Sequence, residues 1–211
     1  MQKITTFLTF KDQAEDALKF YTSVFRNAKA GDIQRYGDGA PVPKGSFMTG
    51  SFEIAGQTFF VLNAGTDFGF APGMSLFVDC PTQEEVDELW DRLSEGGSVQ
   101  ACGWLTDKFG VSWQIVPSVM RKVLADKDPA KVNRVMQAMM QMIKLDGNKL
   151  QQVYEAAWTH GGGDLAAVCR PASPLPPTRP RPRPPPTHPL TRRPTCKSSP
   201  ICFLTAAAKR P

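Results

Sequence analysis

The sequence predicts an α+β fold made of two copies of one unit, in which a strand and a helix are followed by further strands. Short segments of alternating apolar and polar residues fall into two groups. Each group contains one segment whose apolar residues recur at helical spacing. The second group begins roughly 70 residues after the first, as expected for two copies of a supersecondary unit. Only the element order repeats, because the two halves share little residue identity.

The first copy is expected between residues 4 and 63. Residues 4–10 alternate as a strand does, and Asp12 is expected to cap the next helix with Glu15 as its capping-box partner. The apolar stripe of this helix consists of Ala14, Ala17, Leu18, Tyr21, Val24 and Phe25. Three more strands are predicted, at residues 29–36, 46–54 and 57–63.

The second copy repeats this order between residues 74 and 116. Residues 74–78 form its first predicted strand, and Thr82 is expected to cap a helix with Glu85 as its partner. The apolar stripe of that helix consists of Val86, Leu89, Trp90 and Leu93. The strands that follow are predicted at residues 98–105 and 111–116.

A predicted hairpin at residues 102–117 is the most informative segment. Asp107 opens its turn and Gly110 supplies a residue free to adopt positive φ. On the strand after the turn, Gln114 points to one face and Trp113 to the other. We expect Trp113 to pack between sheet and helix. Whether Gln114 faces a cavity, and whether that cavity holds a metal, is the central question.

Helices are predicted again in residues 118–157, which we treat as a helical extension. Asp128 and Pro129 are typical of a helix start. An apolar stripe follows, made of Val132, Val135, Met136, Met139, Met140 and Ile143. Core or subunit packing is the favoured interpretation of this stripe, with a flexible ligand lid as the alternative.

Composition divides the chain at about residue 157. Residues 1–157 contain 16 Lys+Arg and 19 Asp+Glu, whereas residues 158–211 contain nine basic residues, one acid and 13 of the 19 prolines. The first piece is long enough to bury one core, and the second is expected to be a disordered Pro/Arg-rich tail. This tail fits a nucleic-acid contact, a ligand of proline-recognising domains, or a non-native extension from a shifted reading frame. We favour the last because the compositional break is abrupt.

The cysteines and histidines exclude several kinds of site. The five cysteines form no CxxC pair, which disfavours a zinc site or a disulfide framework. Both histidines, His160 and His188, lie in the tail, so His-dependent chemistry is disfavoured in the compact piece. Cys102 then has no histidine to activate it and is expected to be an inert thiol. No apolar run indicates a signal peptide or a membrane span, and a cytoplasmic setting is expected.

Two motifs resemble a known family. They are Gln-Ala-Glu-Asp-Ala-Leu-Lys-Phe-Tyr at residues 13–21 and Cys-Gly-Trp-Leu-Thr-Asp-Lys-Phe-Gly-Val-Ser-Trp-Gln-Ile-Val-Pro at residues 102–117. Both are similar to the PhnB-like branch of the vicinal oxygen chelate (glyoxalase/bleomycin-resistance) superfamily, often labelled 3-demethylubiquinone-9 3-methyltransferase. The resemblance covers about residues 2–157. It implies paired βαβββ modules, at about 2–66 and 72–117, whose sheets form an open curved β-barrel around a cavity.

The resemblance also tests for a metal. In metal-dependent members of the superfamily, four inward side chains, usually His, Gln or Glu, hold a divalent ion. The corresponding positions here are Thr5, Gly73 or Ser75, Leu62 or Asn63, and Gln114. None is anionic or an imidazole, whereas a hard divalent cation needs anionic oxygens or several placed carbonyls. We therefore predict no catalytic metal and no other cofactor.

A cavity for a small organic ligand is expected on the faces that these strands share. Its predicted lining is Thr5, Phe7, Thr9, Asn63, Ser75, Trp104, Ser112 and Gln114. Gln114 either orients a ligand oxygen or bonds to a neighbouring strand, and Trp104 can stack on a planar ligand. Taken singly, the other polar residues are better explained by structural roles.

Functions of three classes stay open. The leading hypothesis is binding of a small organic molecule in a metal-free cavity. The alternative is an active enzyme, either the methyltransferase of the family label or a metal-dependent lyase or dioxygenase. We disfavour methyl transfer because the chain has no GxGxxG turn of the kind that binds such cofactors. A third hypothesis is an interaction protein that acts through its tail. Exposed sheet edges also predict a homodimer, with no membrane partner and no nucleic acid bound by the domain.

Overall fold

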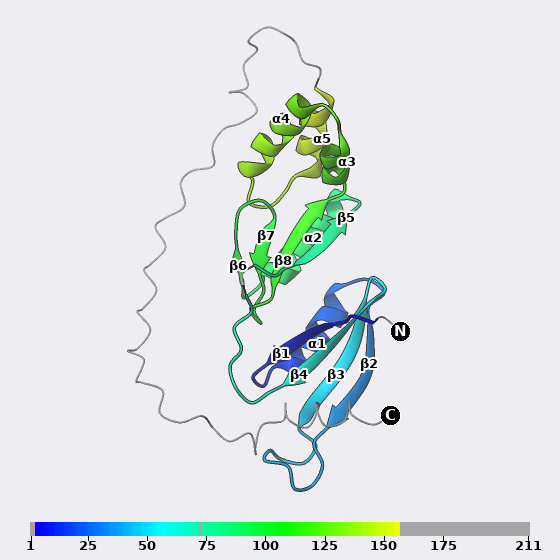
Figure 1. The fold of residues 1–211 in the computed structure, drawn as a ribbon, viewed down its shortest axis with the longest axis vertical. Coiled ribbons are helices and arrows are strands. Elements are labelled where there is room, and N and C mark those ends of the chain that lie inside the picture. The colour runs from blue at the N-terminus through cyan, green and yellow to red at the C-terminus, as the bar shows by residue number, and fades with distance from the viewer. Residues whose placement is uncertain (1–2, 72, 157–211) are drawn as a thin grey trace, which may run out of the picture. The chain divides into compact units, whose positions relative to one another are not determined.

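The computed structural model describes residues 3–71 and 73–156, and within them it confirms the α+β class and the repeated element order (Figure 1). Expectations about the tail lie outside these residues. The first module contains β1 (Thr6–Phe10), α1 (Ala14–Val24), β2 (Lys29–Arg35), β3 (Phe47–Ile54) and β4 (Gln57–Asn63). The second module contains β5 (Leu76–Cys80), α2 (Gln83–Ser94), β6 (Ser98–Val99), β7 (Trp104–Thr106) and β8 (Ser112–Pro117).

Each module forms one four-stranded sheet with the same topology. The strand orders are β1-β4-β3-β2 and β5-β8-β7-β6. In both sheets the first strand pairs in parallel with the last, and the remaining neighbours are antiparallel. The described strands therefore make two sheets and no closed barrel. β1 and β5 lie at the edges of their sheets, so each has one side without a partner among the described strands.

The start of α2 agrees with the prediction and the start of α1 does not. The Glu85 amide donates to Thr82 Oγ1 at 3.3 Å, as expected for the capping box. In α1 the predicted cap Asp12 has no such role. Instead the Ala14 amide donates to Asn63 Oδ1 at 2.8 Å. The end of β4 lies beside the start of α1, and a distant amide thereby replaces the local cap.

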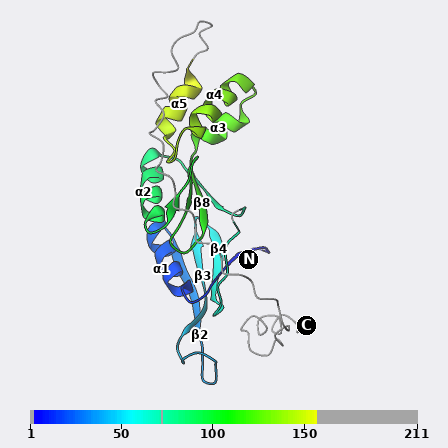
Figure 2. The same ribbon diagram turned by 90° about the vertical axis from the view of Figure 1, so that its left-hand side faces the viewer.

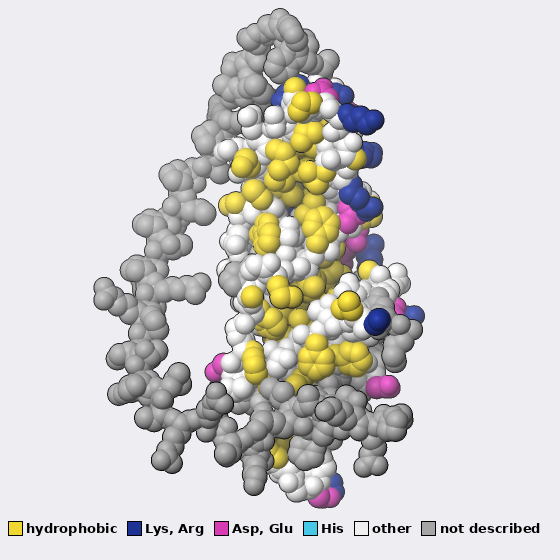
Figure 3. Space-filling view, viewed as in Figure 1, with side chains coloured by type: hydrophobic (Ala, Val, Ile, Leu, Met, Phe, Trp, Pro, Cys, Tyr) yellow, Lys and Arg dark blue, Asp and Glu magenta, His cyan; other side chains and the backbone are white. Residues whose placement is uncertain are grey.

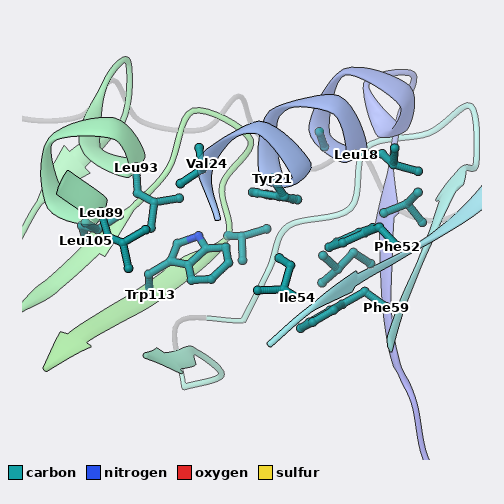
Figure 4. Close-up of a cluster of buried hydrophobic side chains, with 14 of the residues drawn as sticks. Leu18, Tyr21, Val24, Phe52, Ile54, Phe59, Leu89, Leu93, Leu105 and Trp113 are labelled. Carbon is teal, nitrogen blue, oxygen red and sulfur yellow. The ribbon is translucent and has the colours of Figure 1, made fainter. Parts of the chain in front are cut away.

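α1 and α2 each cover one face of their own sheet (Figure 2). Their apolar stripes join one hydrophobic core that includes residues of both modules. Tyr21 is fully buried in it, with its ring centroid 5.7 Å from that of Phe52 and 5.6 Å from that of Trp113 (Figure 4). Trp113 therefore packs on the helix side of its sheet, as its position opposite Gln114 predicts.

The helical extension forms a second core. It consists of α3 (Val119–Ala125), α4 (Pro129–Met140) and α5 (Gly147–Glu155). Asp128 caps α4 by accepting from the Ala130 amide at 2.9 Å, as predicted. Val135 of α4 is completely buried in this core, and Val132, Met136 and Met139 pack against it, so this part of the apolar stripe is packing surface. Met140 of the same stripe is 62% exposed. In the described part of the chain, no helix is long and apolar enough to cross a membrane.

The predicted strand at residues 98–105 is interrupted. Cys102 and Gly103 adopt positive φ angles of 62° and 79° and separate β6 from β7. Their amides donate to the carbonyls of Met142 and Ile143, each at 2.8 Å. These bonds attach the loop to the segment between α4 and α5, and they bend the chain away from the extended conformation that its alternation predicts.

Candidate ligand-binding site

Gln114 lies in the middle of the open face of the second sheet. Its strand register places Phe77 of β5 on one side and Trp104 of β7 on the other. Gln114 Nε2 donates to Ser75 Oγ at 2.7 Å. Phe77 is 57% exposed and Trp104 is half-buried. This row, the amide row, combines one hydrogen-bonded amide with two accessible aromatic side chains.

The first sheet has an equivalent row on its own open face. Phe7 of β1 is in register with Phe60 of β4, and their rings stack at 6.2 Å. The two rings are 46% and 39% exposed. Hydrophobic side chains accordingly appear over both sheets on the face that Figure 3 shows. Thr9 is in register with Leu62 on the same face, whereas Asn63 points to the helix face.

A hollow of about 700 Å³ lies where the first module meets the edge strand β5. The end of α1 and the β3–β4 turn form one side, and residues 74–79 form the other. Ser75 and Phe77 connect it to the amide row. We call it the junction hollow, and its apolar walls include Val24, Phe25, Ile54, Phe59, Leu89 and Trp113.

The structure brings together only part of the predicted cavity. Ser75 lines the junction hollow, and Gln114 reaches it through the hydrogen bond to Ser75. Asn63 was predicted to line the cavity, but its side chain contacts the start of α1 instead. Its amide oxygen accepts from the Ala14 amide, and its amide nitrogen donates to the Asp12 carbonyl at 3.1 Å. The other predicted residues lie along or beside the strands and do not line the hollow: Thr5, Phe7, Thr9, Trp104 and Ser112.

The side chains at the four positions implied by the superfamily do not fit a divalent metal. Asn63 is occupied with α1, and Leu62 has no donor atom. The amide nitrogen of Gln114, which is no metal ligand, is bonded to Ser75, so Gln114 could offer only one neutral oxygen. Among the residues that the structure describes, no three His, Cys, Asp or Glu side chains gather as a metal site would need. We therefore derive no chemistry through a metal, and the absence of a catalytic metal stays a prediction.

Asp107 has a larger role than opening the predicted turn. It is only 3% exposed, and its carboxylate accepts from Tyr21 Oη and from Trp113 Nε1, each at 2.8 Å. The amides of Phe109 and Val111 complete its contacts at 2.9 and 3.0 Å. Burial raises the pKa of Asp107, while these four hydrogen bonds act in the opposite direction. The buried carboxylate thus joins α1 of the first module to the hairpin of the second.

Two βαβββ modules with one strand order define a class of protein, the vicinal oxygen chelate superfamily with its glyoxalase/bleomycin-resistance fold. The model of the family described as 3-demethylubiquinone-9 3-methyltransferase matches residues 2–116. This match covers more than half of the chain, and the chain belongs to that family.

One solved structure agrees with this assignment, and two others are less similar to the chain. The PhnB protein from Bacillus cereus is 38% identical, with a TM-score of 0.52, and the alignment covers 55% of this chain and 99% of that one. A protein from Pseudomonas aeruginosa is 22% identical with a TM-score of 0.48 over 56% of this chain and 98% of that one. The fosfomycin resistance protein FosX from Listeria monocytogenes is 17% identical with a TM-score of 0.40, over 54% and 90%. No curated protein matches the chain.

Proposed function

We propose that the domain of residues 1–157 binds a small organic molecule in the junction hollow and does so without a metal. The hydrogen bond between Gln114 and Ser75 at the wall of this hollow is the observation that supports it most. Small-molecule sites are typically concave, largely apolar and supplied with few placed polar groups, in volumes of about 300–1,000 Å³. The junction hollow has this composition and size.

The hydrogen-bonded pair of Ser75 and Gln114 can orient the ligand. When Ser75 Oγ accepts from Gln114 Nε2, its own hydroxyl hydrogen and Gln114 Oε1 stay available. A ligand oxygen in the hollow can accept from Ser75, whose hydroxyl is oriented by the hydrogen bond from Gln114. Phe77, which lines the hollow beside Ser75, offers an aromatic surface to the rest of the molecule.

A ligand screen followed by two substitutions tests this proposal. Protein-observed NMR with a library of small organic molecules is expected to find binders that shift the signals of Ser75 and Phe77. Ser75→Ala and Gln114→Met should each weaken them about ten-fold, the effect of one lost hydrogen bond in a water-poor site. Thr106→Ala is the matched control, since Thr106 lies on the same sheet but outside the hollow. Affinities that are unchanged in both variants would contradict the assignment.

We also propose that the protein is a homodimer in which the edge strands β1 and β5 take part. No described strand pairs with the outer side of either one, and exposed Phe7 and Phe77 lie on them. Native mass spectrometry of the full chain, prepared without chelators, reports mass, metal and retained ligand together. A dimer free of metal is expected. A monomer would contradict the dimer, and stoichiometric Zn²⁺, Mn²⁺ or Ni²⁺ would contradict metal-free binding.

The family description names a methyltransferase, and that activity is the alternative function. It is tested by incubating the purified chain with S-adenosylmethionine and a demethylubiquinone analogue and following methyl transfer. We expect no turnover, because the sequence has no glycine-rich turn between a strand and a helix to hold the donor. Clear turnover would replace binding by catalysis as the function of this site.

A further inference from the structure

The junction hollow is lined by three acidic residues and one basic residue, Arg26. Arg26 Nη2 lies 2.7 Å from Glu88 Oε2, and Glu88 also lies 3.6 Å from Arg92. Asp79 pairs with Arg121 and accepts from Ser118 Oγ. Two of the three acidic residues are therefore balanced by arginines from neighbouring helices or loops.

Glu85 is the acidic residue without such a balance. Its backbone amide is bonded to Thr82, but the described residues provide no ion pair for its carboxylate. Glu85 is half-buried and lines the hollow from the first turn of α2. Burial raises the pKa of the Cys80 thiol to about 12, and the negative charge of Glu85 is the second cause of this rise. The charge of Glu85 therefore also affects a buried group.

Aromatic side chains line the same hollow as this carboxylate. Phe25 and Trp113 both line the hollow, and their rings are 5.4 Å apart. Phe59 and Phe77 line it as well. The faces of aromatic rings attract cations, and a partly desolvated carboxylate attracts them more strongly than one in bulk water. An apolar body with one positive charge satisfies both features, whereas an organic anion would be repelled by Glu85.

From this arrangement we propose that the junction hollow selects small organic cations, meaning amines or amidines with an apolar body, and that Glu85 holds the positive group. This inference rests on the proposed ligand-binding function and names the ligand class of that site. The polar pair at Ser75 and Gln114 then orients a neutral group of the same molecule. Ser75 lies near the start of residues 74–79, whereas α2 follows the end of this segment.

A matched pair of probes tests the charge. 2-Phenylethylamine and 2-phenylethanol have similar shapes, and only the amine is positively charged at pH 7. In NMR titrations of the full chain we expect the amine to bind about five-fold more tightly than the alcohol, as expected for one partly exposed ion pair. This preference should fall as NaCl is raised, because salt screens the pair. 3-Phenylpropionate should bind more weakly than the alcohol.

Glu85→Gln is the decisive variant. Glutamine is also accepted at this capping-box position, so α2 should keep its start. The variant should reduce the amine affinity to that of the alcohol and leave the alcohol unchanged. Glu84→Gln removes an exposed carboxylate from the same turn and should change neither. Equal binding of amine and alcohol to the wild type would overturn cation selection while ligand binding stands. Failure of all three probes to bind would overturn both.

Discussion

At the scale of single residues, the carboxylate of Asp107 joins the two modules, because it accepts from Tyr21 of α1 and from Trp113 of β8, each at 2.8 Å. Trp113 lies in the core and Gln114 on the open face, as alternation along the strand predicts. The turn that Asp107 opens can be recognised locally, but its burial depends on Tyr21, which is 86 residues away in the sequence. No local pattern contains that contact.

Asp107 should therefore be among the most sensitive positions of the domain. In Asp107→Asn, one side of the carboxylate becomes an amide donor, which must face the donor atoms of Trp113 and Tyr21 or of the turn. We expect a loss of about 2–4 kcal/mol in the free energy of unfolding, measured by urea denaturation. Tyr21→Phe removes only one donor and should cost about 1–2 kcal/mol. A loss under about 0.5 kcal/mol for Asp107→Asn would refute this role of the carboxylate.

At the scale of elements, helical periodicity predicted α1, α2 and α4, while the ends of elements followed tertiary contacts. α2 and α4 begin with caps that the sequence contains locally, at Thr82 and Asp128. α1 begins against Asn63, 49 residues further along the chain, so its cap could not be found by local reading. The same reason explains why Asn63 was assigned to the cavity.

α1 also contributes an ion cluster that should make stability depend on pH. Glu15 bonds to Arg35 of β2 at 2.9 Å and to Lys19 at 2.9 Å, and these bonds lower the pKa of Glu15 to about 2. The folded state then binds the Glu15 proton less readily than the unfolded state does. The contribution is fully present above about pH 4.5 and is lost as the pH falls toward 2.

Urea midpoints between pH 2 and pH 6 test this cluster. Stability should rise with pH across that range, and Glu15→Gln should make the rise shallower. Salt at about 0.5 M should do the same in the wild type, since the cluster lies at the surface. Glu84→Gln is the control, because the described residues provide no ion pair for Glu84. Equal slopes in wild type and Glu15→Gln would show that other groups cause the pH dependence.

At the scale of the whole molecule, the repeated order of elements predicted two modules, and the same strand order in both sheets bears this out. The junction hollow was not predicted. It needs the β3–β4 turn of one module to lie beside the edge strand of the other, and no alternation pattern reports on that contact. Of the residues predicted to line the cavity, only Ser75 lines the hollow. It does so because it precedes the edge strand β5 and bonds to Gln114 on the open face.

The two cores also predict where the folded domain ends. Within the described residues both cores are complete by Tyr154, and α5 closes the second with the fully buried Leu150. A chain of residues 1–157 should therefore melt within about 2 °C of the full chain by circular dichroism and bind 2-phenylethanol equally well, since it keeps every residue of the two described cores. The matched control is a chain of residues 1–145, which loses α5. It should lose about 2–5 kcal/mol, because Leu150 no longer fills its place in the core. A clear drop in melting temperature for the 1–157 chain would instead mean that residues 158–211 stabilise the domain.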